Sequence, residues 1–403
     1  MGNNIKAVIS EFDKFIDFNE REKPILSAKR GVFGKKDSFS LNMLLNNKKE
    51  VNGPNYTQDQ YPVIDLMFEL ALFGKLYIKS NNKDGKLNLL KTPNMESYQS
   101  LNEYEKYVFL LQTYWTKYDF EEKFDRWIDI SDLYLVLSSI ANTETEEVIV
   151  NDNLISAHRM YSLGAAFFYH LKFFDFGELE LTEGAKDKYE DTIKAFYPKT
   201  LGVETSTFLA TEALMYWNSK NVSLVLPPSK RKTLSKKKEN PFDVFRNIFT
   251  DIFTDMTVVK TVEATSETDR SGVYYFKVIL SKTVWRKIRL SHNHSLRDLH
   301  MAIQDAFLFD DDHLYAFYIG GNQRTGKPIY CEDTHGEGTT AEETRIFDLE
   351  LYKGQKMLYL FDFGDQWKFD VELIEIDKEA PLPLKPMIIE SKGEAPEQYG
   401  GEW

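Results

Sequence analysis

Residues 273–280 read VYYFKVIL and residues 284–290 read VWRKIRL. The first stretch is rich in β-branched and aromatic residues, and the second alternates apolar with basic side chains, which is typical of strands that bury one face. Because only a short polar connection separates them, the two stretches predict a β-hairpin. We expect this hairpin to open a C-terminal α+β domain.

The residues after the hairpin continue an α+β pattern. Ser295 can cap a helix that carries Leu296, Leu299, Ile303 and Phe307 on one side. The other expected elements are a strand at 313–319, a loop rich in Gly, Thr and Glu at 320–344, a short helix or turn at 345–351, and two strands at 356–361 and 367–376. This order predicts a β-grasp-like β-β-α-β-β-β domain.

The sequence between the last two strands, residues 362–367, predicts a tight turn. We expect Gly364 to allow the sharp bend and the carboxylates of Asp362 and Asp365 to accept hydrogen bonds from turn amides. We expect Trp367 to anchor the turn in the core.

A run of basic residues divides the chain. Pro227 and Pro228 interrupt regular structure, and the six cations that follow are Lys230, Arg231, Lys232, Lys236, Lys237 and Lys238. We predict a mostly helical part at 1–228, a basic linker at 229–240, and the C-terminal domain at 241–403 with a leading amphipathic helix. The favoured interpretation of the linker is a solvated hinge, and the alternative is a nucleic-acid contact through these cations.

The helical part contains a short internal repeat. FGKLYI at 73–78 recurs as FGELEL at 176–181, and each copy follows an apolar helical stretch, at 61–73 and 161–174. A Lys-Thr pair follows downstream of each copy. The order of apolar helix, glycine stop, strand, loop and Thr-capped helix predicts two winged-helix-like units, at about 55–120 and 150–215.

Winged helices often bind DNA, but the charges disfavour DNA binding for these units. The stretch at 61–73 contains Asp65 and Glu69 and no Lys or Arg, so it lacks the basic face of a recognition helix. The whole chain has a net charge of −13, and residues 271–403 hold 23 acidic and 15 basic residues, a net charge of −8. A protein partner is therefore favoured over nucleic acid.

Six motifs in the C-terminal third occur in one order. They are YFKV at 275–278, WRKI at 285–288, LRDLHMAIQDAF at 296–307, HLYAF at 313–317, YLFDFGDQW at 359–367 and PEQYGG at 396–401. Together they resemble the plasmid pRiA4b ORF-3-like family over about residues 272–403. The resemblance implies an association with bacterial mobile elements, and the family has no established molecular activity.

The resemblance also marks individual residues. Those that match the family's motifs are Trp285, Arg286, His300, His313, Asp362, Gly364, Asp365, Trp367, Pro396, Glu397, Gly400 and Gly401. Phe369 stands where the family usually has His, and Tyr399 stands where its terminal motif has Cys. If the family uses that His and Cys for chemistry, this chain has lost both, which favours a binding or structural role.

Histidines concentrate in the C-terminal domain, where five of the seven lie between residues 292 and 335. With the nearby carboxylates they could form a hydrolytic metal site, for which the candidate ligands are His300, His313 and Asp365. The spacing matches no known zinc motif, so hydrogen-bonded structural histidines are the favoured interpretation. We identify no catalytic residue and expect no cofactor, and a divalent metal stays an open alternative.

Composition narrows the class of protein. With 42% apolar and 14% aromatic residues the chain can bury a core, and its single cysteine, Cys331, excludes an intrachain disulfide. No secretory signal or membrane-length apolar run is visible, so we expect a cytoplasmic protein that does not enter a membrane. The favoured hypothesis is a non-enzymatic protein-interaction module. The alternatives are a DNA-binding regulator that uses the N-terminal units and the linker, and a metal-dependent hydrolase or nuclease that uses C-terminal His and Asp residues.

Overall fold

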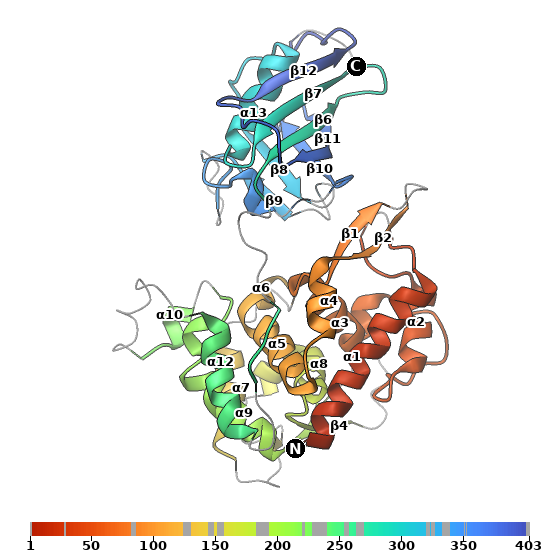
Figure 1. The fold of residues 1–403 in the computed structure, drawn as a ribbon, viewed down its shortest axis with the longest axis vertical. Coiled ribbons are helices and arrows are strands. Elements are labelled where there is room, and N and C mark those ends of the chain that lie inside the picture. The colour runs from red at the N-terminus through yellow and green to blue at the C-terminus, as the bar shows by residue number, and fades with distance from the viewer. Residues whose placement is uncertain are drawn as a thin grey trace. The chain divides into compact units, whose positions relative to one another are not determined.

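The computed structural model divides the chain into two compact units (Figure 1). The first comprises residues 1–24, 33–77 and 91–263, and the second comprises residues 25–32, 78–90 and 264–403. The residues that the structure describes are 2–27, 30–81, 86–123, 130–143, 149–150, 157–182, 193–219, 222–227, 240–253, 258–262, 270–319, 323, 327–332, 339–349, 351 and 353–399. The predicted linker at 229–240 lies outside them, apart from Asn240.

The first unit is mainly helical, as the sequence predicts. Its helices are α1 (Gly2–Glu22), α2 (Lys35–Leu44), η1 (Gln58–Gln60), α3 (Pro62–Phe73), α4 (Pro93–Gln99), α5 (Glu103–Lys117), α6 (Phe120–Lys123), α7 (Ile130–Ala141), α8 (Ala157–Phe173), α9 (Thr200–Thr211), η2 (Leu214–Tyr216), α10 (Val222–Val225) and α12 (Pro241–Ile252). Helices α1, α3 and α12 all pack against α5, most of whose side chains are buried. Among the described residues, no helix combines the length and the apolar character that a bilayer span requires.

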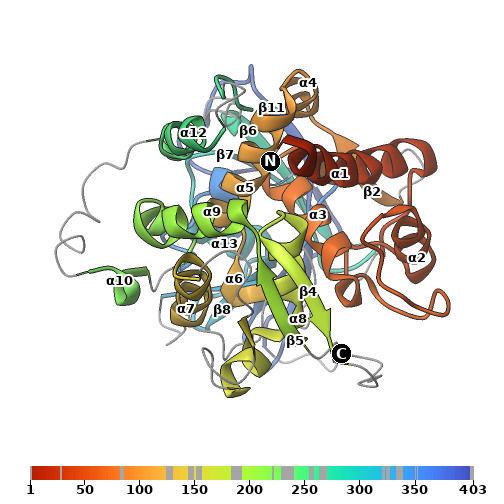
Figure 2. The ribbon, with the colours of Figure 1, turned by 90° about the horizontal axis from the view of Figure 1, so that it is seen from below.

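Two segments have the order helix, strand, strand, helix, where the internal repeat predicts helix, strand, loop and helix. The strands are β1 (Tyr77–Asn81) and β2 (Leu87–Lys91) between α3 and α4, and β4 (Gly177–Leu181) and β5 (Ile193–Pro198) between α8 and α9. Strand β5 also pairs with β3 (Ile149–Val150), and Figure 2 shows β4 beside β5. The backbone hydrogen bonds repeat as well, because Leu76 N–H donates to Ala71 O and Phe176 N–H donates to Leu171 O, both at 2.9 Å.

The register of the repeat differs from the predicted one. The sequence match aligned Gly74 with Gly177, whereas the structure aligns Lys75 with Asp175, which follow α3 and α8 with φ values of 54° and 61°. A non-glycine residue in the left-handed region therefore ends each helix. Gly74 itself has a φ of −73°, and it is required for space, because a Cβ there would lie 2.8 Å from Leu70 O.

The predicted threonine caps are present in one copy of the repeat. Thr92 precedes α4, and its side chain accepts a hydrogen bond from Asn94 N–H. In the second copy the N-cap residue is Lys199, whose side chain makes no capping hydrogen bond, and Thr200 is the first residue of α9. The sequence prediction was wrong here by one position, because the aligned Lys-Thr pairs fall in different structural registers.

Helix α12 belongs to the first unit, although the sequence placed it at the start of the C-terminal domain. It packs against α5 and α9. The ring centroid of Phe249 lies 6.0 Å from that of Tyr107 on α5, and the centroid of Phe245 lies 5.1 Å from that of Phe208 on α9. The apolar stripe is therefore core, and the boundary between the units falls after residue 263.

The second unit is built on a seven-stranded sheet in the order β12-β7-β6-β11-β10-β8-β9, with every neighbouring pair antiparallel. The strands are β6 (Val273–Ile279), β7 (Trp285–Ser291), β8 (Tyr315–Ile319), β9 (Lys327–Tyr330), β10 (Lys356–Phe361), β11 (Trp367–Asp377) and β12 (Met387–Lys392). Helix α13 (Leu296–Phe307) packs Leu299, Ile303 and Phe307 into the core on one face of the sheet. The short helix η4 (Ile346–Leu349) precedes β10, and the α+β class is confirmed.

Two strands extend the predicted order at the edges of the sheet. Strand β9 lies within the segment 320–344 that the sequence predicts as a loop, and β12 follows the last predicted strand. The four residues of β9 are too few for an alternating pattern to be recognised. The other elements occur in the predicted order.

The turn between β10 and β11 differs from the prediction in two respects: among the described residues, Asp362 but not Asp365 accepts hydrogen bonds from the turn amides, and the bend does not require a positive φ at Gly364. Asp362 Oδ1 accepts hydrogen bonds from the N–H groups of Gly364 at 2.8 Å and Asp365 at 3.3 Å. The positive φ values belong to Asp362 (54°) and Gln366 (57°) rather than to Gly364. Aspartate tolerates this region well, so the bend does not depend on glycine. Trp367 is buried, as predicted.

Candidate functional site

A polar pocket of about 360 Å³ lies beside the start of α13 in the second unit. The residues that line it are Arg297, His300, Asp311, Asp312, His313, Leu314, Tyr315, Cys331, Glu332 and Glu342. A capping box formed by Ser295 and Asp298 begins α13, and this fixes where Arg297 and His300 leave the helix. The pocket therefore combines residues from a helix, a strand and three connecting segments.

His300 is only 1% exposed, and both of its ring nitrogens are hydrogen-bonded within the protein. Nε2 lies 2.7 Å from Asp311 Oδ1, and Nδ1 lies 2.6 Å from the hydroxyl of Tyr359. Since a carboxylate can only accept, Nε2 carries the proton and donates to Asp311, while Nδ1 accepts from the Tyr359 O–H. Gln304 Nε2 donates to the same hydroxyl at 2.6 Å and completes a continuous chain of hydrogen bonds.

The aromatic wall of the pocket is uncharged at neutral pH. Burial lowers the pKa of His300 below its ordinary value, and the opposing effect of Asp311 is smaller. The His300 ring stacks on Tyr315 with ring centroids 3.7 Å apart. Burial, together with the carboxylate of Glu342, raises the pKa of Tyr315 above its ordinary value. The wall therefore presents a neutral imidazole and a neutral phenol.

Glu342 supplies a hydrogen-bond acceptor that the described residues leave unused. Its Oε1 accepts from the Tyr315 hydroxyl at 3.1 Å, whereas its Oε2 is buried and has no hydrogen-bond partner in the described part of the chain. Such buried unsatisfied atoms are rare and need an explanation, for example a ligand. The other charged residues of the lining, apart from the two histidines, are Asp311, Asp312, Glu332 and Arg297. The excess of carboxylates suits a positively charged ligand that donates hydrogen bonds.

The C-terminal motif lies against the segment that carries His313. Tyr399 O–H donates to Asp312, which raises the pKa of Tyr399 to about 12, and Gln398 Nε2 donates to Asp312 Oδ1 at 3.2 Å. His313 Nε2 lies 3.4 Å from Asp362 Oδ2 and 3.7 Å from Asp312 Oδ1. Three motifs that are far apart in the sequence thus meet at one corner of the domain.

The candidate metal ligands are only partly brought together. His300 and His313 line the same pocket, but Asp365 does not line it, and His300 has no free nitrogen to offer. Within the ranges described above, no group of three or more His, Cys, Asp or Glu residues is arranged to hold a metal ion. His292 and His294 accept hydrogen bonds from backbone N–H groups, which agrees with the interpretation as structural histidines.

The other residues that match the family's motifs lie in different environments. Arg286 is buried and donates to four backbone carbonyls. Trp285 lies on the opposite face of β7, where Lys277 Nζ is 4.6 Å from its ring centroid. Pro396 is half-buried and Glu397 is exposed. The predicted residues that lie outside the described part of the chain are Gly400, Gly401, Lys230, Arg231, Lys232, Lys236, Lys237 and Lys238.

The two departures from the family pattern fall in different environments. Phe369 is fully buried, and its ring centroid lies 4.9 Å from that of Phe307 and 5.6 Å from that of Tyr359. An apolar ring therefore stands beside the tyrosine that holds His300. Tyr399 is half-exposed and binds Asp312 instead. Phe369 carries no ionisable group, and the hydroxyl of Tyr399 is engaged with Asp312.

Sequence reasoning did not single out Tyr315 or Glu342. Tyr315 lies in the strand predicted at 313–319, and the alternation of side chains along a strand could have indicated that it points inward. Glu342 lies in the acidic segment predicted as a loop, and the spacing of its several acids does not show which one approaches α13. Which acid approaches α13 depends on the path of the chain through β9, and the sequence did not predict this strand.

The second unit is thus an α+β domain with an acidic pocket beside its helix. The family model described as "Plasmid pRiA4b ORF-3-like protein" matches residues 273–403, so the resemblance is confirmed for the C-terminal domain. Among solved structures, a protein of unknown function, MM3350 from Methanosarcina mazei Go1, is 28% identical over 32% of this chain and 74% of that chain, with a TM-score of 0.27. No curated protein matches the chain.

Proposed function

We propose that the C-terminal domain is a protein-recognition module that binds a cationic side chain, arginine or lysine, of a partner protein in the His300 pocket. The observation that carries the proposal is the buried Oε2 of Glu342, which has no partner among the residues that the structure describes, in a pocket with three further carboxylates and one arginine. A guanidinium or ammonium group would balance the negative charge, and a turn of the Glu342 side chain toward the pocket would let that group supply the missing donor.

The contacts of His300 favour binding over catalysis. A general base needs a free lone pair within reach of its substrate, and a metal ligand needs one directed at the metal. The only lone pair of the neutral His300 ring accepts from Tyr359, and its N–H is committed to Asp311. We therefore assign His300 a structural role, in which it holds Asp311 at the pocket wall.

The alternative functions receive less support from this site. Nucleic acid would bring phosphate charges to a pocket that has four carboxylates and one arginine, which is unfavourable. The DNA-regulator hypothesis rests on the N-terminal units and on the linker. Helix α3 of the first N-terminal unit contains no Lys or Arg, and the linker cations lie outside the described residues. An association with mobile elements remains what the family resemblance implies, and the binding proposal does not depend on it.

A Glu342→Gln variant tests the proposal with a near-isosteric change. The probe is a fluorescein-labelled, arginine-rich peptide, and the measurement is fluorescence anisotropy at low ionic strength. We expect the peptide to bind the wild type and the variant to bind about 10-fold more weakly, since a charge-assisted hydrogen bond contributes about 1.5 kcal/mol or more. Glu375→Gln removes an exposed carboxylate outside the pocket and is the matched control.

Two results would count against the proposal. One is equal loss of affinity in Glu342→Gln and Glu375→Gln, which would indicate nonspecific attraction to an acidic protein. The other is equal affinity of the wild type for the arginine-rich peptide and for a glutamate-rich peptide of the same length.

A further inference from the structure

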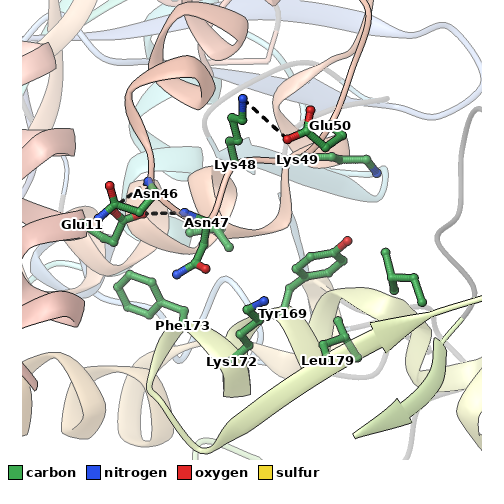
Figure 3. Close-up of a pocket in the computed structure, with 12 residues that line it drawn as sticks. Glu11, Asn46, Asn47, Lys48, Lys49, Glu50, Tyr169, Lys172, Phe173 and Leu179 are labelled. Atoms are coloured by element: carbon green, nitrogen blue, oxygen red, sulfur yellow. Dashed lines mark hydrogen bonds and ion pairs between the residues drawn. The ribbon is translucent and has the colours of Figure 1, made fainter. Parts of the chain in front are cut away.

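A second hollow, of about 340 Å³, lies within the first unit (Figure 3). Its walls come from the segment that follows α2, from α8 and from β4. This volume is within the range of small-molecule pockets in proteins. Neither the internal repeat nor the family resemblance draws attention to it, and it is independent of the His300 pocket.

Two buried polar side chains fix the loop that forms one wall. Glu11 is 3% exposed, and its carboxylate accepts hydrogen bonds from the backbone N–H of Asn46 at 3.0 Å and of Asn47 at 3.4 Å. Asn42 accepts from Lys49 N–H at 2.9 Å and donates to Lys49 O at 2.8 Å. Burying such groups is favourable only when all these bonds form, so the loop is held in one conformation.

The opposite wall is apolar with a cation in it. Phe173 is buried, and Leu179 and Tyr169 are half-buried. In the view of Figure 3, the side chain of Lys172 extends between the rings of Phe173 and Tyr169. This wall can therefore contact a flat apolar group while an ammonium group stands beside it.

The charges of the lining favour an anion. Lys48, Lys49 and Lys172 face two carboxylates, of which Glu11 already has Lys14 Nζ 2.9 Å away. The ion pairs of Lys48 with Glu50 at 3.5 Å and of Lys172 with Glu178 at 3.3 Å both have a partner carboxylate that is more than half exposed. Exposed pairs of this kind contribute little to stability, so a bound anion can replace the carboxylates at small cost.

We propose that this hollow binds a small anion that carries a flat apolar ring. Lys172, which stands beside the rings, holds the phosphate or carboxylate group, and Phe173, Tyr169 and Leu179 cover the ring. Lys48, whose ammonium group is directed at Glu50, adds positive charge at the opposite wall. A nucleoside monophosphate and an aromatic carboxylate share this chemistry. The proposal is for this class of ligand, a small anion with a flat apolar ring, and the experiment below distinguishes its members.

Isothermal titration calorimetry on the full chain tests the proposal with five probes. They are adenosine 5′-monophosphate, 2-naphthoate, adenosine, naphthalene-2-carboxamide and inorganic phosphate. We expect at least one of the two ring-bearing anions to bind about 10-fold or more tightly than its neutral counterpart and than phosphate, because both walls are needed. Binding of the monophosphate identifies a nucleotide-like ligand, and binding of naphthoate alone identifies a carboxylate.

Lysine variants show whether the hollow is the place of binding. Lys172→Met should weaken binding of the probe several-fold, and Lys48→Met, which removes a charge on the opposite wall, should weaken it less. Lys6→Met is the matched control, since Lys6 also forms an exposed ion pair, 3.6 Å from Glu103, but does not line the hollow. The proposal is overturned if neither ring-bearing anion binds, if phosphate binds equally well, or if all three variants bind like the wild type.

Discussion

Replacing Arg286 by methionine is expected to lower the free energy of unfolding of the second unit by about 3–4 kcal/mol. The guanidinium lies on the core side of β7, and its Nε donates to Ala306 O at 2.8 Å near the end of α13. Its Nη1 lies 2.9 Å from Lys392 O and 3.1 Å from Gly393 O at the end of β12. Arg286 thus joins the helix to the edge of the sheet.

The expected effect is large because methionine keeps the packing and removes only the donors. The carbonyls at these positions would lose their partners inside the protein, and each buried unsatisfied group costs about 1–3 kcal/mol. The guanidinium carbon also lies 4.7 Å from the ring centroid of Phe307, a contact that methionine cannot replace electrostatically. Arg286→Lys should recover less than half of the loss, since one ammonium group cannot reach carbonyls on both sides.

Urea denaturation followed by tryptophan fluorescence and far-UV circular dichroism measures this loss. Arg345→Met, which changes an exposed arginine of the same unit, is the control and should stay within about 0.5 kcal/mol of the wild type. An Arg286→Met protein as stable as the wild type would show that solvent replaces the guanidinium and that our account of this residue is wrong.

Lowering the pH is expected to destabilise the first unit through His170. This side chain is 2% exposed, its Nδ1 lies 3.0 Å from the Tyr114 hydroxyl, and burial lowers its pKa to about 3. In the unfolded chain the pKa returns to about 6.5. Between these values the unfolded state binds a proton that the folded state does not, so stability is lost as the pH falls below about 6.5.

The size of the effect follows from the linkage relation. Each pH unit in that window changes the free energy of unfolding by about 1.4 kcal/mol. Between about pH 7.5 and about pH 4.5, His170 should therefore lower the free energy of unfolding by about 2.5 kcal/mol. His170→Gln should remove this part of the pH dependence, and His313→Gln in the second unit should leave it unchanged. Parallel curves for the wild type and His170→Gln would contradict the assignment.

The fold of the C-terminal domain could be predicted because its elements carry strong local patterns. The alternation in β6 and the helical spacing of Leu299, Ile303 and Phe307 both predicted the elements that the structure contains. The pattern of β7 was less informative, because Arg286 faces the core and Trp285 does not. A buried arginine that is satisfied by backbone carbonyls has no signature in the sequence.

Longer-range relations could not be predicted in the same way. The apolar stripe of α12 was recognised, but periodicity does not say which unit will bury it, and Phe249 packs on the first. The internal repeat was found by matching Phe-Gly pairs in the sequence, whereas the backbone conformation repeats at Lys75 and Asp175. The matching amino acids and the matching backbone conformations therefore lie at different positions of the two copies, because the residue in the left-handed region, and not the glycine, ends each helix.

The pocket was predicted only in outline. His300 and His313 were singled out, and the structure places both in it. Their chemistry depends on partners from other segments, Tyr359 for His300 and Asp362 for His313, which only the folded sheet brings close. Glu342, on which the binding proposal rests, has no distinguishing mark in an acidic segment.

The most direct test of cation recognition compares one peptide in two forms, with arginine or with its neutral isostere citrulline. The two side chains have nearly the same shape and differ in the positive charge that the four carboxylates of the pocket would recognise. We predict that the arginine form binds the full chain at least about 10-fold more tightly and that Glu342→Gln removes most of this preference. Equal affinity for the two forms would contradict the proposed function.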